Sequence, residues 1–452
     1  MHTSVLTDMP RPAPTTALRL KQLLLLAACG SLGFYPLLEQ FIAPVLAMSF
    51  ALAAMVAGAG LLHRRLRMPS TFILGIWASL LIVYVGWCAV AIVHGNVGQY
   101  IVTDSAGFLL YIGVLPVLYL LIRQNDLQHS FFQIIEQLSM VIAVLSVVLA
   151  VSFFVLFGPV EADSLLLVNA FLKGLGLSWK VDSNSGALGL YTNVAHLMML
   201  GLALSLYRFS LARRRRELLL VLLYLVALLL DGRRALAIAA ILQLLIAAPQ
   251  LLAMLKPAQR LRLTLGAVAL STVAVVANLD WIQQRFEFTD SDVSSAARFE
   301  QIPPLLDKIA EHPILGGGFG TYASLRRSDE RPFSYEVDFL ATLMKLGLIG
   351  SALYFGSYLF GVMQARRIRD PLGLFLMSAG LPFFFYMGTN GNQAMSTDSA
   401  VFHIYLFLLI AFACEQRRAP AVAAGVASPG SAPDPTVPVL QTAALPHTLT
   451  PT

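Results

Sequence analysis

Arginines beside apolar runs are the first residues of this sequence that could do chemistry. Arg233 and Arg234 stand between two hydrophobic runs, and Arg298 lies within a long polar segment. A guanidinium group binds phosphate oxygens through paired hydrogen bonds, so arginines held at one place favour an anion such as a diphosphate. In the simpler alternative, Asp231 pairs with one of these arginines. We interpret Arg233, Arg234 and Arg298 as candidate anion ligands.

Two carboxylates could supply acid–base chemistry. Glu336 and Asp338 stand where an apolar run begins that is long enough to enter a membrane. A carboxylate that is partly withdrawn from water can take a proton from an attacking hydroxyl group. Alternatively, acids at this place only favour the first turn of a helix, whose N-terminal end attracts negative charge. Both are candidate bases, and for Asp338 the two interpretations stay open.

Metal or nucleotide chemistry has little support in the sequence. His312 lacks a second histidine or a cysteine at ligand spacing, and we interpret it as a hydrogen-bonded structural residue. The glycines at 316–320 indicate a close-packed turn, because no Gly-Lys-Ser/Thr follows to make a nucleotide loop. Asp290 and Asp292 fit a solvated turn. We therefore expect no metal and no other cofactor.

The elements that must position these residues are membrane helices. Hydrophobic residues make up 57% of the 452 residues and charged residues only 12%, whereas roughly 25% charged is usual in soluble domains. This composition excludes a soluble enzyme, a secreted disulfide scaffold and a disordered chain. The net charge of +6 is explained by arginines that orient the helices and gives no reason to expect a nucleic-acid partner.

Apolar runs long enough to cross about 30 Å of hydrocarbon predict an all-α, polytopic integral membrane protein of about 12 transmembrane helices. The predicted spans are 20–38, 41–62, 71–93, 104–122, 134–157, 187–207, 217–230, 235–255, 263–279, 335–363, 371–388 and 399–414. Most of the 31 Lys and Arg residues then fall in loops on the side of the N-terminus. Positively charged loops stay in the cytoplasm, which predicts cytoplasmic N- and C-termini.

This orientation divides the chain into five parts. We expect a cytoplasmic segment at 1–19, nine transmembrane helices in 20–279, a long periplasmic loop at 280–334, three transmembrane helices in 335–414 and a disordered cytoplasmic tail at 415–452. Within the loop, apolar residues recur at three- and four-residue spacing from Phe299 to Ile309, which predicts an amphipathic helix along the membrane surface. We expect Pro303 and Pro304 to interrupt that helix.

Three motifs together resemble the O-antigen ligase and O-antigen polymerase superfamily of bacterial inner-membrane proteins. They are Asp231-Gly232-Arg233-Arg234-Ala235, then Ser295-Ala296-Ala297-Arg298-Phe299 with the His-Pro-Ile-Leu-Gly turn that begins at His312, and finally the helix ending Lys345-Leu346-Gly347-Leu348-Ile349-Gly350. The resemblance covers about residues 190 to 365 and implies a GT-C-like architecture. One departure is that Glu336 and Val337 stand where ligases have histidine and asparagine, which favours a polysaccharide polymerase.

The resemblance implies metal-independent glycosyl transfer at the periplasmic face, from an undecaprenyl-diphosphate-linked donor to a sugar hydroxyl. In such a reaction Arg233, Arg234 and Arg298 would hold the diphosphate, and Glu336 would be the base. Asp338 and His312 would support them. The implied partners are lipid-linked glycans and the bilayer, with a chain-length regulator protein as a further candidate, in the bacterial inner membrane.

Two other functions stay open. An O-antigen ligase, which transfers finished glycan to lipid A core, would share the arginines and differ in its acceptor. A transporter, either a flippase for lipid-linked sugars or a solute carrier, would place ionisable residues at mid-membrane depth and show two related halves. The sequence shows neither of these features, so polymerisation of lipid-linked repeat units into O-antigen or exopolysaccharide is the first hypothesis.

Overall fold

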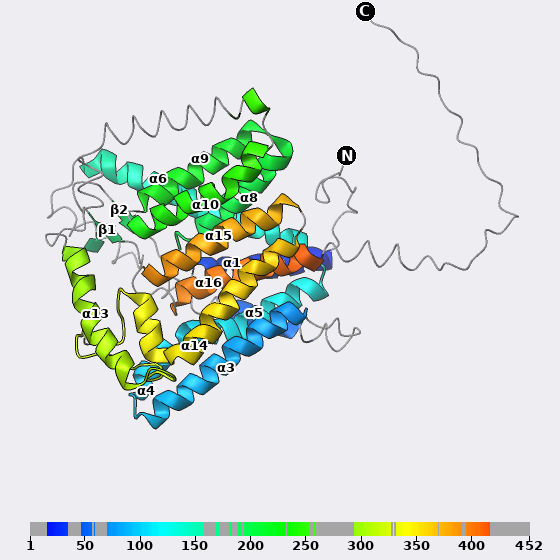
Figure 1. Ribbon diagram of the computed structural model, residues 1–452. Helices are drawn as coiled ribbons and strands as arrows, with labels where there is room; N and C mark the ends of the chain where they lie inside the picture. Colours follow the sequence, from blue (N-terminus) through cyan, green and yellow to red (C-terminus); the bar gives the residue numbers. More distant parts are fainter. Residues whose placement is uncertain are drawn as a thin grey trace, which may run out of the picture.

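The chain forms a bundle of long apolar helices, shown as a computed structural model in Figure 1. The structure describes residues 16–34, 47–56, 58, 70–157, 169–170, 180–182, 189–191, 194–231, 233–253, 256–258, 260, 293–326, 329, 331–368, 370–389 and 395–415. The helices are α1 (Thr16–Phe34), α3 (Thr71–Val93), α4 (Gly98–Asp104), α5 (Ala106–Gln124), α6 (Gln128–Phe157), α8 (Leu197–Ala212), α9 (Arg215–Leu230), α10 (Arg234–Ala253), α13 (Val293–Glu311), α14 (Asp338–Met363), the 3-10 helix η2 (Gln364–Arg367), α15 (Pro371–Thr389) and α16 (Thr397–Glu415). Two short antiparallel strands, β1 (Lys180–Asp182) and β2 (Gly189–Tyr191), pair with each other.

Eight of the described helices are long and apolar enough to cross a membrane, and Ala47–Val56 and α8 are shorter apolar helices. The protein is therefore an integral membrane protein of the predicted all-α, polytopic class. The total of about 12 spans stays a prediction, since the expected span 263–279 lies outside the described residues. So do residues 1–15 and 416–452, together with the Asp290–Asp292 segment.

Burial separates helices in the centre of the bundle from helices at its surface. In α16, 89% of the most apolar window is buried, whereas in α3 the buried share is 28%. A helix that is apolar on all sides must be covered by protein or by lipid. The exposed apolar side of α3 thus faces hydrocarbon, and α16 packs inside the protein, where the Tyr405 hydroxyl donates to the Cys29 carbonyl oxygen of α1 at 2.6 Å.

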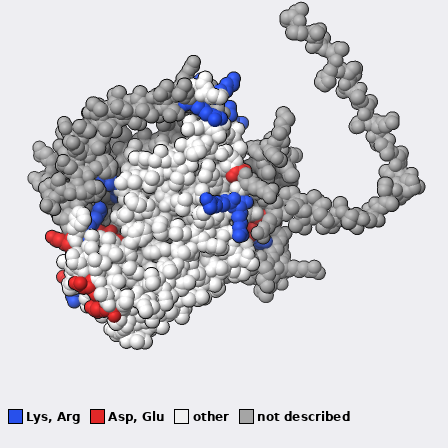
Figure 2. Space-filling view, in the orientation of Figure 1, with Lys and Arg blue, Asp and Glu red and all other residues white. Residues whose placement is uncertain are grey.

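Charged residues gather at two opposite ends of the bundle. On the face seen in Figure 2, a broad zone without charge among the described residues separates them. At one end, Arg123 of α5 pairs with Glu415 of α16, and Arg208 of α8 pairs with Glu136 of α6. The other end holds α4, α13 and the start of α14. This distribution matches a bundle that crosses a bilayer, with its polar side chains in the two interfaces.

The prediction of a break at Pro303 and Pro304 is wrong, because α13 runs without interruption from Val293 to Glu311. A proline at 303 removes the hydrogen bond that the Phe299 carbonyl oxygen would accept. Phe299 is 60% exposed and Pro303 is exposed, so this carbonyl group lies on the open side of the helix. The buried side, with Gln301 and Leu305, keeps the helix packed on the protein.

Candidate active site

Helix α13 brings Arg298 against Glu336, the two residues that the sequence makes candidates for anion binding and for the base. The Arg298 Nε donates to Glu336 Oε2 at 2.9 Å, and the two side chains are 39% and 20% exposed. The pair is thus partly desolvated and still open to a ligand.

A buried glutamine fixes this geometry. Gln301, one turn after Arg298 on α13, is fully buried. Its Nε2 donates to the Ala297 carbonyl oxygen at 2.6 Å, and its Oε1 accepts the backbone N–H of Glu336 at 2.7 Å. Helix α13 and the segment that contains Glu336 are thereby held at a fixed position relative to each other. The Arg298–Glu336 contact is thus supported by hydrogen bonds beyond its own ion pair.

Tyr335, the residue directly before Glu336, is hydrogen-bonded to the backbone of Ala323 and Leu325. Its hydroxyl accepts the Ala323 N–H at 2.7 Å and donates to the Leu325 carbonyl oxygen at 3.1 Å. Burial raises the pKa of Tyr335, so the phenol stays protonated and keeps its donor role at neutral pH. The segment that carries Glu336 is consequently held by Gln301 at Glu336 and by the hydrogen bonds of Tyr335.

Arg233 has a different environment from the one expected for a free anion ligand. Its Nε and Nη2 donate to the two carboxylate oxygens of Asp231 at 2.5 and 3.1 Å, and its Nη1 donates to the Tyr386 hydroxyl at 2.6 Å. The side chains of Arg233 and Asp231 are 8% and 1% exposed. The simpler alternative, in which Asp231 pairs with an arginine, therefore describes Arg233. Arg234, the first residue of α10, is half-buried.

A second polar contact lies near Arg233 and involves His196. His196, which precedes α8, is buried, and its Nε2 lies 2.8 Å from the Asp398 carbonyl oxygen at the start of α16. The imidazole packs against Phe383 and Phe402, whose rings stack on each other. His196 is not among the predicted site residues, although a histidine at the edge of an apolar run is the kind of intramembrane ionisable residue that indicates a site.

The glycine-rich turn after α13 is inserted into a break in α14. Gly347 has φ 60° and ψ −171°, which interrupts the helix. The carbonyl oxygens freed there are used by the turn, since the N–H of Gly317 donates to Met344 at 3.0 Å. In return, the N–H of Leu348 donates to the Pro313 carbonyl oxygen at 3.0 Å. The predicted close-packed turn is confirmed, while the break in α14 was not expected.

A buried ion pair, absent from our predicted site, fastens this turn. Lys345 Nζ of α14 lies 2.6 Å from Asp104 Oδ1 of α4, with side chains that are 1% and 2% exposed. The other carboxylate oxygen of Asp104 accepts the Gly320 N–H at 2.8 Å. A lysine inside an apolar run is costly unless it has a partner, so Lys345 was detectable from the sequence. Its partner, 241 residues away, was not.

His312 and Asp338, the two supporting residues, lie near these contacts in different environments. The His312 ring stacks on His94 at 4.4 Å between centroids, so the second histidine that its sequence neighbourhood lacks comes from the end of α3. Asp338 is the first residue of α14 and is 2% exposed. Among the described residues no group of three or more His, Cys, Asp or Glu side chains could hold a metal ion.

The order and spacing of these elements have a counterpart among known proteins. Residues 219–355 match the family model described as O-antigen ligase. This part of the chain is similar to an O-antigen ligase domain. The matched region includes the Arg233–Asp231 pair, the Arg298–Glu336 pair and the broken part of α14, and it confirms the predicted superfamily. The protein is thus a membrane enzyme of the O-antigen ligase type at this general level. No curated protein shows a significant match to the chain.

Proposed function

We propose that this protein polymerises lipid-linked oligosaccharide repeat units at the periplasmic face of the bacterial inner membrane. The donor would be a glycan on undecaprenyl diphosphate and the acceptor a sugar hydroxyl of a second lipid-linked glycan. The observation that carries the proposal is the half-open Arg298–Glu336 pair inside the region that matches the O-antigen ligase family. It combines a cation for the leaving diphosphate with a carboxylate for the attacking hydroxyl.

In this reaction the acceptor oxygen bonds to the anomeric carbon of the donor while the bond from that carbon to the diphosphate oxygen breaks. Glu336 takes the hydroxyl proton, and the electron pair of the broken bond leaves with the diphosphate. Arg298 stabilises the charge that develops there, because hydrogen-bond donors fixed in advance need no reorganisation as the charge appears. Arg234 is the second candidate for the diphosphate, and attack from the opposite face inverts the anomeric centre.

The contacts of Arg233 alter the part we assign to it. Since Asp231 and Tyr386 already accept from its guanidinium group, a diphosphate would meet Arg233 as part of a nearly neutral pair rather than as a free cation. We therefore propose that Arg233 fixes the α9–α10 connection and places Arg234, while Arg298 contributes most of the positive charge.

A ligase is the second candidate function, and the description of the matched family favours it. Glu336, at the position where ligases have histidine, favours the polymerase. The two functions share the donor and the leaving group and differ in the acceptor, which is either another lipid-linked glycan or lipid A core. We propose the polymerase, with cytoplasmic termini and a chain-length regulator as partner.

The test is the surface and lipid-linked glycan profile of a deletion strain complemented with variants of the full chain. We expect wild type to restore long glycans, and Arg298→Ala and Glu336→Gln to leave single repeat units at unchanged protein levels in the membrane. Lys308→Ala is the matched control, because Lys308 lies on the same helix and forms an exposed pair with Glu311 at 2.5 Å.

Each outcome separates the candidate functions. Single repeat units without long chains support a polymerase, whereas long chains that accumulate on the carrier lipid identify a ligase. Full complementation by both Arg298→Ala and Glu336→Gln would refute the assigned site and favour a lipid-linked sugar flippase or a solute transporter. Loss of long glycans in Lys308→Ala would show that any charge change on α13 disrupts the protein.

A further inference from the structure

A hollow lies at the end of the bundle opposite to the Arg298–Glu336 pair. It is formed where α10 ends and where η2 leads into α15, and it has a volume of about 430 Å³. Binding sites for small ligands usually measure roughly 300–1,000 Å³. Its lining combines the cation of Arg366, the carboxylate of Asp370, the amide of Gln250 and apolar walls that include Leu374 and Met377.

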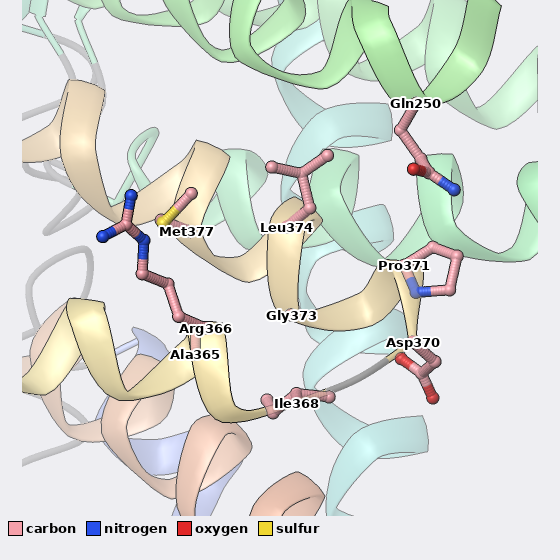
Figure 3. A pocket seen from close by; sticks show the side chains of 9 residues that line it. All are labelled: Gln250, Ala365, Arg366, Ile368, Asp370, Pro371, Gly373, Leu374 and Met377. Atoms are coloured by element: carbon pink, nitrogen blue, oxygen red, sulfur yellow. The ribbon is translucent and has the colours of Figure 1, made fainter. Parts of the chain in front are cut away.

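The charged groups stand on opposite sides of this hollow. Figure 3 shows the Arg366 side chain extending along α15 toward Met377, whereas Asp370, Pro371 and Gln250 lie together on the other side. A single ligand between them can therefore meet a guanidinium with one part and a carboxylate with another. Such an arrangement suits a zwitterion better than a simple anion, which the carboxylate would repel.

The charged groups of Arg366 and Asp370 also lie at different depths along α15. Since α15 begins at Pro371, Met377 lies about 9 Å further along the helix into the membrane, at 1.5 Å rise per residue. Arg366 reaches toward that deeper level, and Asp370 precedes the helix at its polar end. In an aminophospholipid the phosphate lies nearer the acyl chains and the ammonium nearer the water, which is the same order.

We propose that this hollow binds the headgroup of an aminophospholipid, with Arg366 on the phosphate and Asp370 on the primary ammonium. Gln250 can donate from its amide to a phosphate or ester oxygen, and Leu374 and Met377 line the path for an acyl chain. Basic pockets between membrane helices bind the phosphate groups of anionic lipids, and here the carboxylate of Asp370 adds a contact for an ammonium. Apart from Gln250, the lining residues lie outside the matched region 219–355, and the proposal does not depend on the transfer reaction.

The experiment measures lipids retained by the full-length protein. Protein purified in mild detergent is offered phosphatidylethanolamine, phosphatidylcholine and phosphatidylglycerol with identical acyl chains in equal amounts, and bound lipid is counted by native mass spectrometry. We expect wild type to retain phosphatidylethanolamine over phosphatidylcholine about fivefold, the size of effect that one partly exposed charge contact can produce. Choline has no N–H to donate to Asp370.

The variants assign the two contacts separately. Asp370→Asn should abolish the preference for phosphatidylethanolamine over phosphatidylcholine, and Arg366→Ala should lower retention of all three lipids. Leu374→Trp, which fills the apolar side without changing charge, should also lower retention. Arg367→Ala is the matched control, since Arg367 is exposed on the same turn and does not line the hollow.

Three results would overturn the proposal. Equal retention of the three lipids by wild type would mean that the lipids bind around the helices without recognition of the headgroup. Preferred phosphatidylglycerol would indicate recognition of negative charge alone. An effect of Arg367→Ala as large as that of Arg366→Ala would assign the binding to general charge at this end of the bundle.

Discussion

The contacts of Arg233 lead to a prediction on stability. Asp231 accepts from Arg233 through both of its carboxylate oxygens, and both side chains are buried. Asp231→Ala would leave the guanidinium without its counter-charge, and breaking a buried pair in this way costs about 3–5 kcal/mol. We expect a large fall in the thermal unfolding midpoint of the detergent-purified protein. Tyr386→Phe removes one hydrogen bond to a charged group, at roughly 1.5–3 kcal/mol, and should lower the midpoint less.

An exposed ion pair provides the comparison for this series. Lys308 and Glu311 have side chains that are 30% and 53% exposed, and pairs of this kind contribute about 0–1 kcal/mol. The hydrogen bond from Lys308 nevertheless lowers the pKa of Glu311. Lys308→Ala should leave the unfolding midpoint almost unchanged. If Asp231→Ala lowered the unfolding midpoint no more than Lys308→Ala does, the contacts of Arg233 would not contribute to stability.

Single residues of the site could be predicted, but a partner could be predicted only where it is a close neighbour in the sequence, as Asp231 is for Arg233. Arg298 and Glu336 were both selected from the sequence, yet their direct contact follows from the path of α13, which no local pattern reveals. Arg233 was selected as an anion ligand, and its close neighbour Asp231 holds it in a buried pair. Asp104 was missed altogether, because only the folded chain brings it to Lys345.

Two glycines of α14 should respond in opposite ways to the same substitution. A Cβ on Gly347 would lie 2.4 Å from the Gly316 nitrogen, at a φ of 60° that favours glycine. We expect Gly347→Ala to cost more than the 1–3 kcal/mol typical of such a backbone conformation and to release the turn that carries Gly316. The thermal unfolding midpoint should fall, and the amount of long glycans in the complemented strain should fall with it.

Gly356 on the same helix is the matched control. A Cβ there would meet no heavy atom within 4 Å, and alanine is favoured over glycine by about 1 kcal/mol inside a helix. Gly356→Ala should therefore keep or raise the unfolding midpoint. Equal losses in the two variants would mean that α14 tolerates no added methyl group at all, and that the inserted turn is not the cause.

At the level of elements, length and hydropathy predict the helices well and their irregularities poorly. The predicted spans 371–388 and 399–414 correspond closely to α15 and α16, since a membrane leaves few alternatives to a helix of about 20 apolar residues. The break at Gly347 has another cause, the hydrogen bonds offered by a distant turn. Likewise, the continuity of α13 through Pro303 depends on which side of the helix is open.

The whole molecule is organised by the distribution of charge between its two ends. Arg213 and Arg214 connect α8 to α9, which itself begins with Arg215 and Arg216, whereas α13 carries both acidic and basic residues. The positions of Lys and Arg along the sequence predicted a difference between the two ends, because orientation in a membrane depends on Lys and Arg in the short loops. The sequence also indicated few ionisable residues at mid-membrane depth, and on the face in Figure 2 a zone without charge among the described residues separates the two ends.

The two ends lead to a prediction about sidedness, which cysteine labelling can test. With Cys29, Cys88 and Cys414 replaced, single cysteines are introduced as Asp307→Cys on α13 and Arg214→Cys before α9, both at exposed positions. If α13 lies in the periplasm, a membrane-impermeant maleimide should label Asp307→Cys in intact spheroplasts and Arg214→Cys only after permeabilisation. Equal labelling of both variants in permeabilised membranes is the control. The reverse pattern would place the Arg298–Glu336 pair in the cytoplasm, where a periplasmic polymerase could not work.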